Sequence, residues 1–150
     1  MRVPTMYVQH EDWELLKSVI KEATVKFGEC SWVGIGYPIE PTEDEPMHYQ
    51  VERIVYPEQE NTAGSTEFDD DAMATILAGL QEGERVIWHG HSHGNMDCFF
   101  SGDDNKLYSD WTKDMTADFF LMTIHTNKSN SLSQRFHWKG VDVNCSQCII

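Results

Sequence analysis

The sequence is poor in basic residues. Its 150 residues include 11 Lys and Arg against 25 Asp and Glu, which gives a formal net charge of −14 at pH 7. Because affinity for nucleic acid depends on Lys and Arg neutralising phosphates, this balance argues against nucleic acid as a partner. An acidic surface most often serves solubility, and among partners it favours basic or lysine-bearing ones.

The chain also lacks any run of about 18 apolar residues, the length that a membrane-spanning helix needs. Residues 1–6 do not contain the apolar core of a secretory signal peptide. We therefore expect a cytoplasmic protein that does not enter a membrane.

Cysteine is too scarce for the disulfide framework of a small secreted domain. The four cysteines are Cys30, Cys98, Cys145 and Cys148. The last two form a Cys-x-x-Cys pair, but no second pair completes a four-thiolate zinc site. We assign this Cys-x-x-Cys pair no role. A redox or metal-binding function is the less favoured alternative.

Spacings of three and four residues between apolar side chains predict three helices. The first covers residues 10–27 and ends at Gly28. The second begins at Asp69 or Asp70 and runs through Leu80, and the third follows Ser101 or Gly102. The predicted buried faces carry Met73, Ile76, Leu77 and Leu80 in the second helix, and Leu107, Trp111 and Met115 in the third.

Short apolar or alternating segments predict strands at 30–39, 48–56, 85–89, 118–126 and 132–138, with 141–143 as a further short strand. Polar residues 58–67 predict a loop, and 127–130 a turn. Helices and strands intermix without a repeat or a linker. We therefore expect one domain, residues 1–150, of the α/β or α+β class, with a sheet flanked by helices.

Two histidines, a serine and an aspartate fall between His91 and Asp104. His91 and His93 are separated by one residue, so on an extended segment both imidazoles point to the same side and can reach one metal ion. Asp104 would supply a third ligand. Three protein ligands and an open fourth position are typical of catalytic zinc. The spacing therefore predicts one zinc ion per chain, held by His91, His93 and Asp104.

The pattern Ser101-x-x-Asp104 before a helix is also that of a capping box, in which the two residues satisfy each other's backbone N–H groups. Taken alone, this local interpretation is the stronger one. The histidine pair upstream, at the end of a strand, favours the metal site. The two roles are compatible, because a cap can hold Asp104 at a helix start that faces the metal.

These residues match a known signature. His91-Ser92-His93, a gap of seven residues, Ser101 and then Asp104 resemble the His-x-His, Ser, x-x, Asp motif of the JAMM metalloproteases, also called the JAB or MPN domain. In appearance the chain is most similar to prokaryotic and phage members. The likeness covers most of the chain and includes Glu29 before the glycine-bearing segment 32–36. Gly94 stands where many deubiquitinating relatives have proline.

The resemblance implies an MPN/JAB-like fold, in which a mixed, largely antiparallel sheet lies between helices in a cytidine-deaminase-like three-layer arrangement. It implies zinc-dependent hydrolysis of a peptide or isopeptide amide bond by metal-activated water. Glu29 would be the general base, and Ser101 would stabilise the oxyanion. The implied substrate is a protein or peptide, with a ubiquitin-like tail among the candidates. If the chain is phage-encoded, its compartment is the host cytoplasm.

Several alternatives stay open. A non-catalytic MPN-like scaffold or phage assembly module, binding zinc or a protein partner, is the alternative function. Glu22 and Glu40 are the other candidates for the base. His89 is interpreted as packing beside or supporting the ligands rather than as a ligand. The remaining histidines, His10, His48, His125 and His137, are interpreted as ordinary strand or surface residues, and Cys98, Phe99 and Phe100 as lining a cleft or filling the core.

Overall fold

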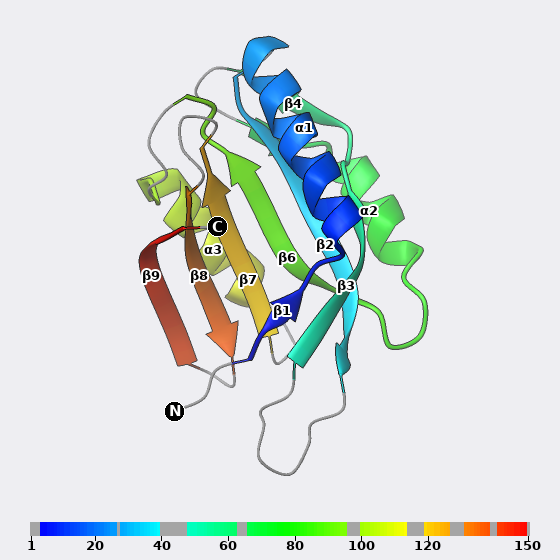
Figure 1. Ribbon diagram of the computed structural model, residues 1–150. Helices are drawn as coiled ribbons and strands as arrows, with labels where there is room; N and C mark the ends of the chain where they lie inside the picture. The colour runs from blue at the N-terminus through cyan, green and yellow to red at the C-terminus, as the bar shows by residue number, and fades with distance from the viewer. Residues whose placement is uncertain are drawn as a thin grey trace.

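The computed structural model describes residues 4–26, 28–39, 48–62, 66–95, 100–113, 119–126, 131–138 and 141–149. Within these ranges a seven-stranded mixed sheet is flanked by three helices (Figure 1). In chain order the elements are β1 (Met6–Tyr7), α1 (His10–Lys26), β2 (Cys30–Ile39), β3 (His48–Val55), β4 (Gln59–Asn61), β5 (Thr66–Phe68), α2 (Asp70–Ala78), β6 (Arg85–Ser92), α3 (Gly102–Lys113), β7 (Phe119–His125), β8 (Ser131–Trp138) and β9 (Val141–Ile149).

The strands of the large sheet follow the order β1-β3-β2-β6-β7-β8-β9, and β4 and β5 form a separate two-stranded sheet. The pairs β1–β3 and β6–β7 are parallel, whereas the other neighbours are antiparallel. The predicted mixed, largely antiparallel sheet is therefore confirmed. β6 lies at its centre, paired on both edges, so its backbone groups are satisfied without water.

The helices divide between the two faces of the sheet. The apolar side of α1, including Leu16 and Ile20, joins one core cluster with the two tryptophans Trp32 and Trp88. Side chains of α2 and α3 pack on a second cluster around Val33, on the other face. In Figure 1, α1 crosses one face over β2 and β6, and α3 lies behind the sheet. The arrangement is helix, sheet, helices.

The three predicted helices and five main strands are present, and apart from β6 their ends agree closely with the predicted ones. The α2 start is confirmed in detail, because the Asp69 side chain accepts a hydrogen bond from Ala72 N at 3.0 Å. Leu107 and Trp111 of α3 pack on the second cluster as predicted. Met115 and the turn 127–130 lie outside the described residues.

Four details of the prediction were wrong. Residues 58–67 are not all loop, because β4 and β5 pair there as a short hairpin. β6 continues three residues beyond the predicted end at His89, to Ser92, since β2 and β7 pair with it on both edges. β9 extends to Ile149, well past the predicted end at Val143, because β8 pairs with it. Leu77 is not buried, since 52 % of it is exposed.

No helix within the described ranges combines the length and the apolar character that crossing a membrane requires.

Gly90 lies at the point where β2 and β6 make close contact. A Cβ atom at Gly90 would lie 2.3 Å from Cε2 and 2.4 Å from Nε1 of Trp32, whose side chain is fully buried. The absence of a side chain at Gly90 thus lets the indole of Trp32 cover the middle of β6, next to the strand's histidines.

We predict that Gly90→Ala lowers the free energy of unfolding by about 1–3 kcal/mol, because the added methyl overpacks a core without free space. Urea denaturation followed by circular dichroism measures this change. Gly102→Ala is the control, since a Cβ there meets no atom within 4 Å. Equal stability of the two variants would contradict the interpretation.

Candidate metal and active site

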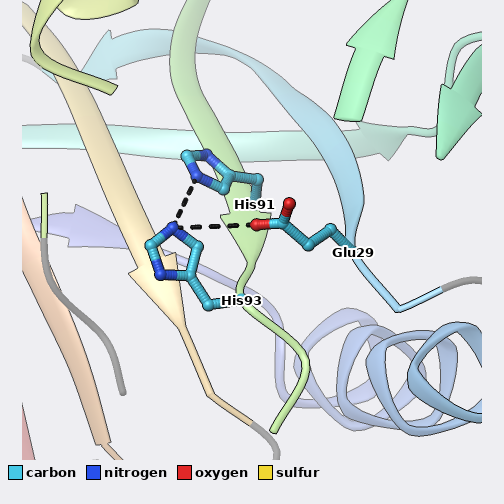
Figure 2. A group of neighbouring side chains, drawn as sticks. All are labelled: Glu29, His91 and His93. Atoms are coloured by element: carbon cyan, nitrogen blue, oxygen red, sulfur yellow. Dashed lines mark hydrogen bonds and ion pairs between the residues drawn. The ribbon is translucent and has the colours of Figure 1, made fainter. Parts of the chain in front are cut away.

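Three elements converge at one end of the sheet. Glu29 directly precedes β2, His91 lies in β6 and His93 follows it (Figure 2). The antiparallel register pairs Cys30 with Ser92 and Ser31 with His91, so the residue before β2 lies opposite the residue after β6. Asp104 lies in the first turn of α3 and faces the two histidines.

The functional atoms of these residues lie close together. The Nε2 atoms of His91 and His93 are 3.3 Å apart. Asp104 places Oδ1 at 2.8 Å from His91 Nε2, and Oδ2 at 3.2 Å from His93 Nε2. Glu29 Oε1 is 3.8 Å from His93 Nε2. The group Glu29, His91 and His93 could hold a metal ion, and all four side chains are buried.

The predicted capping box is also present. Ser101 N donates to Asp104 Oδ2 at 2.8 Å, and Asp104 N donates to Ser101 Oγ at 3.1 Å. This reciprocal pair satisfies two backbone N–H groups at the start of α3. The cap fixes the Asp104 carboxylate in the orientation that faces both histidines, so the local and the metal interpretations describe one arrangement.

The two carboxylates of the site differ in their electrostatic environment. Burial raises the pKa of Glu29, against the opposing effect of His93 and His91. Burial also acts to raise the pKa of Asp104, but hydrogen bonds from His91, His93 and Ser101 N–H outweigh it and hold that pKa well below its usual range. Ionisation is therefore easier for Asp104 than for Glu29.

Gly94 holds the loop after His93 against the chain before Glu29. Its φ of +61° is in the left-handed region, which proline cannot adopt. A Cβ at Gly94 would lie 2.8 Å from the carbonyl oxygen of Gly28. The glycine at this position, where many relatives of the resembled family have proline, therefore permits a direct backbone contact between the two sides of the site.

The β4–β5 hairpin is attached to the start of β2 by one side chain. Gln59 Oε1 accepts a hydrogen bond from Ser31 N at 2.7 Å, and Gln59 Nε2 donates to Ser31 O at 2.9 Å. Thr66 Oγ1 lies 2.7 Å from Ser31 Oγ, and Glu29 N donates to Thr62 O at 2.9 Å. Gln59 thus pairs with Ser31 as a neighbouring strand would, and the hairpin positions the backbone beside Glu29.

The structure brings together all five predicted site residues: Glu29, His91, His93, Ser101 and Asp104. Which of the two carboxylates binds the metal stays a prediction. Of the other candidates for the base, Glu22 is exposed and paired with Lys26 at 2.7 Å, and Glu40 lies outside the described residues. Gln59 and Thr66 were missed, because a glutamine in a polar segment carries no sequence signal of its partner.

The other histidines differ in their surroundings. His89 is buried, and its ring lies 4.9 Å from that of Trp111 and 6.1 Å from that of His91, as expected for a packing residue. Burial lowers the pKa of His89 to about 3, and the charge of His91 adds to this effect. His125 is buried too, where its Nε2 lies 2.9 Å from Thr123 Oγ1, so it is a strand residue of the core. His10 is exposed.

The cysteines and the loop before α3 add no further ligand among the described side chains. Cys30 is a buried free thiol whose Sγ lies 3.5 Å from Ser92 Oγ. Cys98 and Phe99 lie outside the described residues, as do the side chains of Cys145 and Cys148 in β9. Phe100 packs against the second core cluster, which agrees with a core-filling role.

The chain was compared with known proteins. No protein-family model matches it, and no curated protein matches it. Among solved structures it is similar to a protein of Desulfitobacterium hafniense whose solution structure came from a structural-genomics consortium. The TM-score is 0.59 at 15% identity, and the match covers 97% of this chain and 91% of that chain. At this identity the likeness shows the fold alone.

We predict that Gln59→Ala lowers the free energy of unfolding by about 1–3 kcal/mol, because the partly buried N–H and C=O of Ser31 lose their partner. Amide hydrogen exchange at residues 29–31 should accelerate more than exchange in β7. Gln81→Ala is the matched control, since Gln81 is exposed and its side chain makes one long hydrogen bond, at 3.4 Å. Unchanged exchange at 29–31 would contradict the role of the hairpin.

Proposed function

We propose that the protein is a zinc-dependent metallopeptidase or isopeptidase of the JAMM type, with an MPN/JAB-like fold, which hydrolyses an amide bond. The observation that carries this proposal is the convergence of two imidazole nitrogens and the Asp104 carboxylate, with Glu29 beside them, in a buried group at one end of the sheet.

The donor set suits zinc. Imidazole and carboxylate are common zinc ligands, with Zn–N distances of about 2.0–2.1 Å in a tetrahedron. Two such ligands on one ion lie about 3.3 Å apart by this geometry, and the Nε2 atoms of His91 and His93 lie 3.3 Å apart. The distances from Asp104 to the two histidines, 2.8 and 3.2 Å, are in the same range. His91, His93 and Asp104 are therefore the proposed ligands.

Glu29 fits the role of the base better than that of a ligand. Its Oε1 is 3.8 Å from His93 Nε2. The donor atoms of the three proposed ligands lie closer to one another, at 2.8, 3.2 and 3.3 Å. A bound zinc ion would supply a Lewis acid that lowers the pKa of a bound water toward neutrality. Glu29, only 4% exposed, would accept a proton at its carboxylate and donate it to the leaving amine.

In the proposed reaction, Ser101 stabilises developing charge. Its Oγ accepts the N–H of Asp104 at 3.1 Å. A hydroxyl keeps one donor after accepting such a bond, and within the described residues Ser101 donates to no acceptor. That proton is therefore available to the carbonyl oxygen of the scissile amide. The proposed substrates are proteins or peptides in the cytoplasm, and a ubiquitin-like tail is one candidate.

The metal itself is testable without a substrate. We predict that the purified wild-type chain, supplied with zinc and dialysed, retains about one zinc per chain by atomic emission, and that Asp104→Ala and His91→Ala lose it. His10→Ala is the control, since His10 is exposed at the start of α1. Wild-type protein that holds no zinc would overturn the catalytic proposal.

The base is tested by Glu29→Gln. We expect this variant to keep its zinc but to lose about 100-fold or more in kcat, because the amide side chain cannot accept the proton. Hydrolysis is measured with fluorogenic peptide libraries and with tagged ubiquitin-like tails. Glu22→Gln should retain full activity. Undiminished turnover of Glu29→Gln would place the base elsewhere, and zinc binding without any hydrolysis by the wild type would favour the scaffold alternative.

A further inference from the structure

A hollow of about 600 Å³ lies beside the candidate site, on the face of the sheet that α2 and α3 cover. Its walls are apolar and come from β5, α2 and α3, through Phe68, Met73, Leu77, Leu107 and Trp111. This volume is typical of small-ligand pockets and is large enough for a long side chain.

The rim of the hollow is acidic. Glu67, Asp70 and Asp110 line it and are exposed, and among the described lining residues there is no Lys or Arg. A smaller hollow of about 290 Å³ shares Glu67, Phe68 and Asp70 and adds further acids from β4 and the segments beside it. Within the described part of the chain, none of the three rim acids is in an ion pair. The combination of apolar walls and unpaired acids is complementary to a cation on an apolar stem.

The hollow lies near the candidate site, because two of its lining residues neighbour His91 in the sheet. Ser31 and His89 line it. His89 lies two residues from His91 in β6, and Ser31 of β2 lies opposite His91. Residues two apart in a strand point to the same face, so the hollow and the site open on one side of the sheet. The rings of His89 and His91 are 6.1 Å apart. This is close to the spacing between alternate side chains of an extended peptide.

Two further features indicate that the hollow takes a ligand. His89 is 2 % exposed, and within the described residues its Nδ1 makes no hydrogen bond, an uncommon state for a buried nitrogen. Leu77 is 52 % exposed at the edge of the hollow, although it continues the apolar stripe of α2. An apolar side chain left open beside acids is typical of a recognition surface.

We propose that this hollow binds a basic side chain, arginine or lysine, of an extended peptide substrate, close to the bond that is cut. The inference rests on the proposed function and names its substrate class. The aliphatic stem lies along Met73, Leu77 and Leu107, where it replaces water. The charged head reaches Asp70 and Asp110, and the ring of Trp111 adds a cation–π contact.

Binding is measured without turnover, on the zinc-loaded Glu29→Gln chain. The probes are fluorescein-labelled alanine hexapeptides that carry one arginine, at each position in turn, and matched peptides with citrulline, which keeps the shape but removes the charge. Fluorescence anisotropy should show the best arginine peptide binding about tenfold more tightly than its citrulline counterpart. Raising the salt concentration should reduce this difference.

A double variant, Asp70→Asn with Asp110→Asn, should abolish the preference for arginine over citrulline while zinc content and thermal stability stay at wild-type levels. Asp71→Asn is the matched control, because Asp71 is an exposed acid of α2 that does not line the hollow. In this control the preference should persist.

Equal affinity for arginine and citrulline, no measurable binding of any peptide, or a preference that survives the double variant would each overturn the inference. These results are separable from failure of the proposed function. A chain that binds zinc and cleaves peptides without regard to arginine refutes only the basic subsite. A chain without zinc that still prefers arginine in the hollow refutes only the hydrolase.

Discussion

The antiparallel pairing of β2 with β6 determines where Glu29 and the two histidines of the candidate site lie. Because Ser31 is opposite His91, the residue before one strand meets the residue after the other, and Glu29 reaches His93 although the two are far apart in the chain. A slip of one residue would turn His89 and His91 toward α1. The register is protected by the contact of Trp32 with Gly90, and by the pairing of β6 on both edges.

Around this pairing the site concentrates two carboxylates and two imidazoles in a space with little water. Such a group is costly to bury unless its members satisfy one another. The two acids differ in how burial affects them. Asp104 accepts hydrogen bonds from His91, His93 and Ser101 N–H, which hold its pKa low. The pKa of Glu29 is instead raised by burial. The same folding pattern thus lowers the pKa of one carboxylate and raises that of the other within one cluster.

The sequence predicted the parts of this arrangement that depend on spacing along the chain. His91 and His93 are two residues apart at the end of β6, and Ser101 and Asp104 form a local cap, so both could be found without a structure. The β4–β5 hairpin could not, because its strands have three residues each and its Gln59 side chain bonds to Ser31, which is distant in the sequence. Leu77 was misplaced, since apolar periodicity identifies the face of a helix but does not distinguish a filled core from an open hollow.

The cap at the start of α3 has a consequence for how the site is assembled. Oδ2 of Asp104 accepts the Ser101 N–H and also faces His93, so the carboxylate belongs to the helix and to the site at once. The sheet positions the two histidines, but the Asp104 carboxylate is in place only when the first turn of α3 has formed and packed against the sheet. For the proposed zinc site, metal affinity would then depend on the docking of α3 as well as on the sheet, because a chain with α3 undocked would lack the Asp104 carboxylate.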